Sequence, residues 1–402
     1  MRTTGLATKR LVCAMAVTAV VVSLSAQAAS AAPTVVAKKR LARGVKYVHI
    51  TDSSYPIHMY VLKFRPRTRA TLDDVLSSSP ISTAKKTSEM ATNAGALAAI
   101  NGDLNDWPGR PTHQYVSNGM VVQTGDRPGY SFAFRRDETG ATIGRHPLKI
   151  TATSTHPNAT VPVVNWNEEA PRTDQVVGYS WYGGKANHPA PGQCSARLVS
   201  PTPMRWNANQ VGTGRDYTVD AVRCSTTVGM SVGSANAVVL SAKLVGTGAA
   251  FINDLAVGST VHVGWSNDSP GALDVVSGSA LIVQGGVIQY DPSCNADLCQ
   301  RNPRTAVGIT AKGRVVLLVV DGRTSVSAGF TLYQLGREMK ALGAVDAVNL
   351  DGGGSSTMWI KGLGVVNHPT DSTGERAVSN AIVILPGADK SEPAPLAPRV
   401  AY

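Results

Sequence analysis

Residues 349–357 read Asn-Leu-Asp-Gly-Gly-Gly-Ser-Ser-Thr and follow directly after an apolar run. Three consecutive glycines are costly inside a helix or strand, so they indicate a backbone that turns tightly or approaches another group closely. A Gly-rich turn exposes N–H groups that suit the oxygens of a phosphate or a sugar. The neighbouring Asp351 carboxylate could act as an acid or base. A tight turn with a helix-capping Asp would have the same sequence, so both interpretations stay open.

The pattern that leads into this motif occurs twice. Residues 331–351 and 82–103 each predict a helix that stops at a glycine, then a buried apolar strand, then Asn-x-Asp. The spacing from the glycine to the Asn, and from the Asn to the Asp, is the same in both. If the two strands are neighbours in one sheet, Asp103 and Asp351 emerge at the same edge. Chance similarity between two Ala-rich segments is the alternative.

The N-terminal segment has the three parts of a secretory signal peptide. Basic residues precede an apolar run over residues 11–24, which is too short to span a membrane comfortably. Small residues follow, and cleavage is expected between Ala28 and Ala32. We therefore expect a secreted, extracellular protein with a signal peptide over residues 1–32 and without stable membrane insertion.

The charge and the rest of the chain suggest one exported domain. The formal net charge is +11, and +8 remains once the three basic residues before Pro33 are removed. Such an excess suggests an anionic partner such as a wall polymer or phosphorylated glycan, although solubility alone explains it equally well. No nucleic-acid partner is expected. We expect an N-terminal linker over residues 33–41, a single catalytic domain over residues 42–386 and a Pro-rich tail over residues 387–402.

The cysteine count favours disulfides. The chain has 5 cysteines, of which Cys13 would leave with the signal peptide. An even set of four in an oxidising compartment favours two disulfides. Chain order suggests Cys194–Cys224 and Cys294–Cys299, with three pairings possible. The four lack a Cys-x-x-Cys spacing, which argues against zinc.

The fold class is α+β, with strand-rich mixed sheets and a few packing helices. Between about residues 108 and 271, short apolar runs recur every ten or so residues among Gly, Thr and Asn. That spacing is typical of strands and loops.

Charged residues stand at the ends of other predicted strands. A buried strand over residues 315–320 follows the turn at Lys312-Gly313 and ends in Asp321-Gly322-Arg323. Arg304 begins the preceding apolar run, and Glu375-Arg376 follows further along. Strand ends hold side chains at fixed places, and a guanidinium matches two phosphate oxygens at once. Each feature alone also fits a plain turn or a solvated ion pair.

Together these motifs resemble the phosphodiester glycosidase family. The residues that carry the resemblance are Arg-Thr-Ala-Val-Gly (304–308), Val-Asp-Gly-Arg (320–323), Gly-Phe-Thr-Leu (329–332), the motif at 349–357, Asn-x-Pro-x-Asp (367–371), Glu-Arg-x-Val-Ser-Asn (375–380) and Ala-Ala-Ile-Asn-Gly-Asp (98–103). The resemblance spans roughly residues 42–386, is dense from Arg301 onward and is thin between residues 129 and 270. It departs from the family where Leu104-Asn105 replaces Phe-Phe and where a Cys-containing insertion precedes Arg304.

The resemblance implies a glycosidase that hydrolyses sugar-1-phosphodiesters, such as those of N-acetylglucosamine, between the anomeric carbon and the phosphate oxygen. The candidate catalytic residues are Asp351 and, as its rivals, Asp321, Asp103 and Glu375. The candidate residues for binding phosphate and sugar are Arg304, Arg323, Asn101, Gly352, Gly353, Gly354, Ser355, Ser356, Asn367 and Arg376. Such a site needs donors for the phosphate and a carboxyl group for the leaving oxygen, the water or the developing positive charge.

Other signals are weaker. Residues 229–233 match the Gly-x-Ser-x-Gly elbow around Ser231, but a strand rather than a helix is predicted after it. The histidines form no metal-ligand pair, and His113 is interpreted as a loop or surface residue. No cofactor is expected to be required. Calcium held by Asp103 and Asp351 is the cation weighed, because strand-end carboxylates suit it.

Three alternative functions stay open on the sequence. The fold could carry a glycan-binding protein without turnover. It could belong to a phosphodiesterase that cuts the other P–O bond. It could also be a serine hydrolase acting through Ser231.

Overall fold

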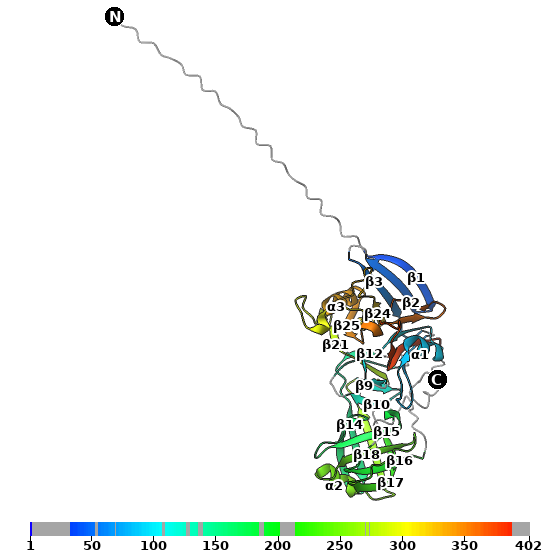
Figure 1. The fold of residues 1–402 in the computed structure, drawn as a ribbon, viewed down its shortest axis with the longest axis vertical. Coiled ribbons are helices and arrows are strands. Elements are labelled where there is room, and N and C mark those ends of the chain that lie inside the picture. The colour runs from blue at the N-terminus through cyan, green and yellow to red at the C-terminus, as the bar shows by residue number, and fades with distance from the viewer. Residues whose placement is uncertain are drawn as a thin grey trace.

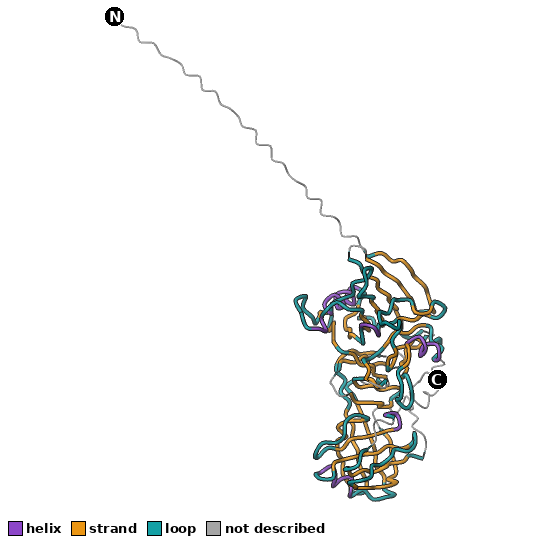
Figure 2. The backbone as a smooth tube through the Cα atoms, viewed as in Figure 1, coloured by secondary structure: helices purple, strands orange, loops and turns teal. Residues whose placement is uncertain are grey.

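The computed structural model describes Met1 and residues 33–387, apart from residues 53–54, 69, 107–108, 126–128, 136–139, 185–188, 202–213, 270 and 273. The expected signal peptide and the tail from residue 388 onward therefore lie outside the described residues. Strands make up most of the described chain, and helices are few and short (Figure 2). The molecule is elongated, with a large sheet at one end and a closed barrel at the other (Figure 1).

An eight-stranded sheet forms one end of the molecule. Its strands are, in spatial order, β1 (Thr34–Ala42), β2 (Val45–Asp52), β3 (Ile57–Phe64), β24 (Val315–Val320), β23 (Arg304–Thr310), β25 (Ala344–Asn349), β21 (Ala280–Gln284) and β22 (Val287–Ile288). Every neighbouring pair is antiparallel. The central β24 is fully buried and reads as a continuous apolar run, as a strand covered on both faces should.

Two five-stranded sheets lie next to it. One has the order β27 (Gly364–Val365), β26 (Met358–Ile360), β6 (Ala98–Asn101), β29 (Asn380–Leu385) and β4 (Thr71–Leu76). The other has the order β10 (Met120–Gly125), β9 (His113–Ser117), β20 (Asp274–Gly278), β11 (Tyr130–Phe134) and β12 (Ala141–Gly144). Two short pairs complete this part: β28 (Ala377–Val378) with β5 (Lys85–Lys86), and β7 (Asn105–Asp106) with β8 (Arg110–Pro111).

A closed barrel forms the far end of the molecule. Its strands are, in order around the barrel, β13 (Lys149–Thr155), β14 (Asn158–Trp166), β15 (Val176–Ser180), β18 (Ala237–Lys243), β16 (Gln193–Val199), β17 (Arg215–Ser225) and β19 (Thr260–Ser266). The pair β14–β15 is parallel, whereas the other pairs are antiparallel. The chain enters the barrel after β12 and returns to β20, so the barrel is an insertion between two strands of one sheet.

Three α-helices of the described chain cover sheet faces. They are α1 (Thr87–Asn93), α2 (Thr247–Asn253) and α3 (Leu332–Ala341), and single turns of 3-10 helix occur at Trp181–Gly183, Asp297–Cys299 and Gly353–Ser355. Helix α3 buries Leu332, Leu335 and Met339 against the eight-stranded sheet. Helix α1 buries Met90 against β6 and β29. A larger core fills the space between the sheets and continues into the barrel.

The strand-rich fold class with a few helices is confirmed, and both helix–strand units occur where they were expected. The closed barrel was not predicted. The predicted linker over residues 33–41 is wrong in structural terms, because residues 34–42 form β1 and pair with β2. Charged side chains at an exposed edge strand give the same sequence pattern as a linker.

The sequence around Ser231 does not form a nucleophile elbow. Residues 229–233 are an irregular loop, Ser231 is exposed, and strand β18 follows rather than a helix. The structure therefore supports the interpretation of this match as accidental.

Among the described residues, no helix combines the length and the apolar character needed to cross a membrane.

Replacing Thr331 by Ala tests how α3 is anchored. The Thr331 side chain accepts a hydrogen bond from the backbone N–H of Gln334 (3.1 Å), and the Gln334 side chain accepts one from the backbone N–H of Thr331 (3.0 Å). Losing this capping box should lower the free energy of unfolding by about 1 kcal/mol in urea denaturation. Thr226→Ala, at an exposed bend, is the matched control and should change it little.

Candidate active site

The glycine-rich motif is the connection by which the chain crosses from one sheet to another. It leaves β25 in the eight-stranded sheet and enters β26, which pairs with β6 in a five-stranded sheet. At the crossing, the backbone N–H of Asp351 donates to the carbonyl of Gly102 (3.0 Å). The prediction that β6 and β25 are neighbours in one sheet is therefore wrong. The two Asn-x-Asp ends nevertheless meet, because two sheets abut at this point.

An arginine lies against each of the three glycines. A β-carbon on Gly353 would lie 3.2 Å from Nη2 of Arg323, and one on Gly354 would lie 2.8 Å from Nη2 of Arg376. A β-carbon on Gly352 would lie 3.9 Å from Cδ of Arg304 and 2.9 Å from the carbonyl oxygen of Pro303. Gly353 also has a positive φ of 61°, which favours glycine. The triple glycine therefore leaves room for guanidinium groups.

Asp351 supplies the carboxyl group of this loop. Its pKa is raised to about 6, mainly by burial and in smaller part by the charge of Asp103. The Ser355 hydroxyl and the charge of Arg376 lower it, although the hydroxyl makes no hydrogen bond of normal geometry with a described residue. A carboxyl group with a pKa near the working pH can both give and take a proton.

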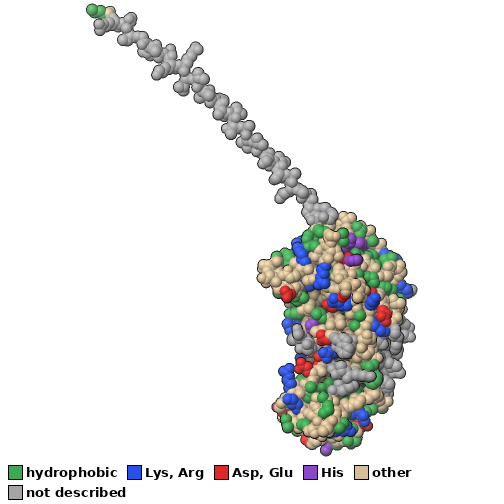
Figure 3. All heavy atoms as spheres, viewed as in Figure 1, with side chains coloured by type: hydrophobic (Ala, Val, Ile, Leu, Met, Phe, Trp, Pro, Cys, Tyr) green, Lys and Arg blue, Asp and Glu red, His purple; other side chains and the backbone are tan. Residues whose placement is uncertain are grey.

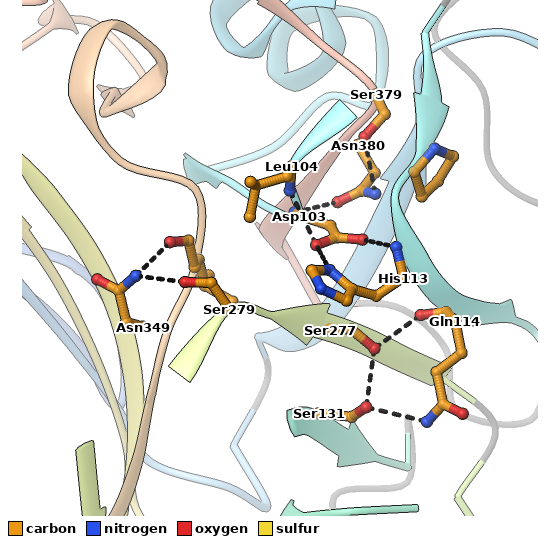
Figure 4. Close-up of polar contacts among 12 residues, drawn as sticks. Asp103, Leu104, His113, Gln114, Ser131, Ser277, Ser279, Asn349, Ser379 and Asn380 are labelled. Atoms are coloured by element: carbon orange, nitrogen blue, oxygen red, sulfur yellow. Dashed lines mark hydrogen bonds and ion pairs between the residues drawn. The ribbon is translucent and has the colours of Figure 1, made fainter. Parts of the chain in front are cut away.

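Asp103 is fully buried and holds a histidine. Its carboxylate accepts hydrogen bonds from the backbone N–H groups of Leu104 and His113 (2.8 Å each) and lies 2.7 Å from Nδ1 of His113 (Figure 4). Burial raises the pKa of Asp103 despite the contacts with His113, which lower it. A carboxylate at Nδ1 fixes the orientation and tautomer of an imidazole. Asp103 therefore positions His113.

His113 is a site residue that the sequence analysis missed. It was interpreted as a loop or surface histidine, but the residue is only about 8% exposed and lies between strands in the interior. No sequence spacing marks it. His113 comes close to Asp103 only because β9 passes the end of β6 in the folded protein, and there its backbone N–H donates a hydrogen bond to Asp103.

Asparagine side chains form hydrogen bonds that link the strand ends around the carboxyl groups. Nδ2 of Asn101 donates to the carbonyl of Asp351 (2.8 Å), and its Oδ1 accepts from the Thr305 hydroxyl (2.8 Å). Asn380, fully buried on β29, accepts from the backbone N–H of Asp103 (3.0 Å). Asn101 thus holds together the backbone segments that carry the carboxyl groups. The contact with substrate that was expected for Asn101 stays a prediction.

Asp321 lies at the end of β24 within a separate set of donors. It accepts hydrogen bonds from the Tyr60 hydroxyl (3.0 Å), Nδ2 of Asn367 (3.2 Å) and the backbone N–H of His368 (2.9 Å). Burial raises its pKa, although these donors oppose the effect. Asn367 also donates to the carbonyl of Ser356 (2.9 Å), so it links Asp321 to the glycine loop.

The three arginines differ in their exposure and in their hydrogen-bond partners. Arg304 is 3% exposed and donates to the carbonyls of Phe330 (3.0 Å), Leu298 (2.7 Å) and Gln300 (2.5 Å). Burial, followed by the charge of Arg323, lowers its pKa to about 10. Arg304 therefore braces the loop that precedes it.

Arg323 and Arg376 are exposed and lie over the glycines. Arg323 donates twice to Oδ1 of Asn302, at 2.8 and 3.1 Å. Arg376 forms an ion pair with Asp371 (2.5 Å). Their guanidinium groups are the ones that an anion arriving from solvent would meet.

Glu375 lies apart from the other acids in function. Both of its carboxylate oxygens accept hydrogen bonds from Ser88, one from the backbone N–H (2.7 Å) and one from the hydroxyl (2.5 Å). Ser88 is in the first turn of α1, where a carboxylate stabilises the helix end. The catalytic role expected for Glu375 stays a prediction.

Three hydroxyl groups of the loop are buried without a hydrogen-bond partner among the described residues. They belong to Ser355, Ser356 and Thr357, and the backbone N–H of Thr357 is bound to Asn101 (3.1 Å). Buried hydroxyls are normally paired, so these three are candidates for hydrogen bonds to a ligand. Ser355 and Ser356 were predicted to bind phosphate, and that role stays a prediction.

The two predicted disulfides are confirmed. Cys194–Cys224 joins the paired strands β16 and β17 of the barrel, and Cys294–Cys299 closes the loop whose carbonyls bind Arg304. The Cys-containing insertion before Arg304 is therefore tied to the site's framework.

Carboxylates that could share a cation lie elsewhere. Asp73, Asp74 and Asp274 are buried, with one oxygen from each within 4.8 Å of the others. An acidic cluster alone does not define a metal site. Asp103 already accepts three hydrogen bonds, which makes it a poor calcium ligand, and a cation between Asp103 and Asp351 stays a prediction.

The glycine loop thus brings carboxyl groups together with Arg323 and Arg376, whose guanidinium groups over Gly353 and Gly354 are here called the anion cradle. Residues 219–385 match the family model described as phosphodiester glycosidase. The matched range contains the glycine loop, Asp321 and the three arginines, whereas Asp103 and His113 lie outside it.

Relatives share limited segments. One segment is 43% identical over 113 residues to bovine (Bos taurus) N-acetylglucosamine-1-phosphodiester α-N-acetylglucosaminidase, covering 25% of this chain and 21% of that protein. Another is 38% identical over 89 residues to the uncharacterized prophage-derived protein YomE of Bacillus subtilis, covering 22% of this chain and 14% of YomE. The matches thus span less than a quarter of either relative.

A hypothetical protein from Synechocystis has the same fold. Its crystal structure gives a TM-score of 0.66 at 18% identity, covering 88% of this chain and 64% of that one.

Substituting Gly354 by Ala tests the cradle. The new methyl group would meet the terminal nitrogen of Arg376, a flexible and exposed group, so the arginine should move while the fold persists. Affinity for inorganic phosphate, measured by calorimetry, should fall roughly tenfold, which is the scale of one charge-assisted contact. Gly144→Ala, whose methyl group would make an ordinary 3.7 Å contact, is the matched control. Equal affinities in both variants would contradict the cradle.

Asp351→Asn should stabilise the protein at high pH. Because the folded-state pKa is raised from 3.8 to about 6, ionised Asp351 destabilises the fold above pH 6, and this cost is absent below about pH 4. Removing the charge should raise the free energy of unfolding at pH 8 by at most about 3 kcal/mol and change it little at pH 4. Urea denaturation at both pH values measures this. The exposed control Asp297→Asn should show no such difference.

Proposed function

We propose that the protein is a secreted hydrolase of sugar-1-phosphodiesters, of the N-acetylglucosamine-1-phosphodiester type, in glycans or cell-wall polymers. The observation that carries the proposal is the glycine loop. It brings two exposed arginines and the unpaired hydroxyls next to a carboxyl group whose pKa is about 6. The bond cleaved joins the anomeric carbon to the bridging phosphate oxygen.

The phosphate occupies the cradle of Arg323 and Arg376 in this proposal. Guanidinium groups neutralise a phosphodiester and stabilise the additional charge that develops as the phosphate leaves. Both lie over the glycine loop and both are exposed, so they can reorganise from Asn302 and Asp371 to the ligand.

Asp351 is then the proton donor to the bridging oxygen. A bound phosphate anion beside it raises its pKa further above 6, because like charges disfavour ionisation. As the bond from the anomeric carbon to oxygen breaks, the Asp351 proton moves to the leaving phosphomonoester. Water adds its oxygen to the anomeric carbon and loses a proton, for which we assign the Asp103–His113 pair as acceptor.

The comparisons support the class of substrate and the compartment. The name of the bovine relative describes action on an N-acetylglucosamine-1-phosphodiester, although the match covers only 21% of that protein. Two disulfides suit an oxidising compartment, as secretion requires.

Hydrolysis in ¹⁸O-labelled water tests the reaction. The label should appear in the free sugar, and Asp351→Asn should lower kcat by roughly 10²–10⁴-fold for a simple alkyl phosphodiester. The loss should be smaller for a nucleoside-diphosphate sugar, whose leaving group needs less protonation. Asp297→Asn should retain full activity. Label in the phosphate would mean a phosphodiesterase that cuts the other P–O bond, and tight binding without turnover would mean a binding protein.

A further inference from the structure

The end of the eight-stranded sheet that lies away from the active site gathers positive charge from three connections. Arg43-Gly44 joins β1 to β2, Arg65 follows β3, and Lys312-Gly313-Arg314 joins β23 to β24. Antiparallel pairing brings these connections together, since Phe64 at the end of β3 lies opposite both Val45 and Val315. The backbone N–H of Arg65 also donates to the carbonyl of Gly44 (2.9 Å).

Two adjoining cavities open at this end. One has a volume of about 960 Å³ and the other of about 680 Å³, and they share Arg65 and Arg314 in their walls. The charged residues that line them, here called the basic groove, are Lys38, Arg40, Arg43, Lys46, Lys63, Arg65, Arg67, Arg135, Lys312 and Arg314. No acidic residue is among the described residues that line either cavity.

Three of these cations form a row across neighbouring strands. In the register of the sheet, Arg40 lies opposite Lys46, and Lys46 lies opposite Lys63. Contact with Lys38, then burial, then the charges of Lys38 and Lys63 lower the pKa of Lys46. Like charges directly opposite each other are destabilising in a sheet. Among the described residues, none of these four forms a salt bridge, but the positive charge of Lys63 interacts with the carboxyl group of Glu338 and partly offsets the burial that raises its pKa. The repulsion in the row is therefore relieved only in part.

The groove is separate from the active site. Strand β24 begins at Val315 in the groove wall and ends beside Asp321 in the active site. A strand of six residues spans about 17 Å. A ligand that occupies both places must therefore be a chain several repeats long.

We propose that the basic groove binds a linear polymer with repeating phosphate groups and holds the same chain whose sugar-1-phosphodiester is cleaved at the glycine loop. The role in cleavage rests on the proposed function, whereas the binding does not. A concave wall with ten cations, and with no acid among its described residues, suits a flexible polyanion, and binding should weaken with salt because it releases counterions.

The lining favours a phosphate polymer over a nucleic acid. Proteins that bind single-stranded nucleic acid stack bases on exposed aromatic rings. The aromatic residues of the two cavities are Phe64 and Phe134, and each is only 1% exposed. A polymer without bases does not use such stacking, so the lack of exposed aromatic rings does not weaken its binding.

The binding experiment compares two triple variants with the same change in charge. Lys63→Ala/Arg65→Ala/Arg314→Ala removes cations from the groove. Arg223→Ala/Lys243→Ala/Lys361→Ala removes three exposed cations outside it. Such a control is available because basic side chains occur along the whole face in Figure 3. The probe is long-chain inorganic polyphosphate, measured by calorimetry at several salt concentrations, with Tm recorded to confirm folding.

We expect the groove variant to bind polyphosphate at least roughly tenfold more weakly and with a shallower salt dependence, and the control to match the wild-type protein. Equal weakening in both variants would overturn the proposal, as it would show that net charge alone is responsible. Tighter binding of a single-stranded oligonucleotide of equal charge, or of anionic lipid vesicles, would overturn it in favour of those partners.

The activity experiment separates this proposal from the proposed function. On a short sugar-1-phosphodiester the groove variant should keep the wild-type kcat/KM, and on a phosphate-linked polymer it should show a raised KM with unchanged kcat. Absence of hydrolysis by the wild-type protein would refute the proposed function and leave the binding result standing. An unchanged KM on the polymer would refute the shared-chain role.

Discussion

The side chain of Asn101 is the connection on which the site depends. It is fully buried, and its amide joins three parts of the chain: the carbonyl of Asp351, the hydroxyl of Thr305 on β23 and the backbone N–H of Thr357. Two sheets meet at this residue, and the glycine loop passes between them. An unpaired amide in the interior costs several times the net value of one hydrogen bond, so the three partners are held as a unit.

Around that connection the protein holds charges where folding alone would not favour them. Asp351, Asp103 and Asp321 all have a raised pKa with burial as the main cause, and burial likewise lowers the pKa of Arg304. Groups with shifts of this kind gather at functional sites, because the environment that makes a carboxyl group reactive also makes its charge costly. The disulfide-closed loop that Arg304 braces fixes part of this environment from outside.

Sequence patterns predicted the elements well and their neighbours less well. Helix α3 and strands β24 and β25 follow from apolar periodicity and glycine stops, which are local properties. That β6 and β25 belong to different sheets depends on which strands pair across more than two hundred residues, and periodicity carries no such information. His113 was missed for the same reason, since its role comes from the place where β9 passes Asp103. The arginines could be singled out from chain position, but the sequence did not distinguish Arg304, which braces a loop, from Arg323, which faces solvent.

Strand β1 has a consequence for how copies of the protein meet. It is the outer strand of the eight-stranded sheet, and its residues from Thr34 to Arg40 are exposed. An exposed edge offers unpaired backbone groups to another chain and invites strand addition. Lys38, Lys39 and Arg40 place positive charge along that edge, so two copies approaching edge to edge repel each other. The described strands of the barrel form a closed sheet and therefore offer no such edge at the other end of the molecule.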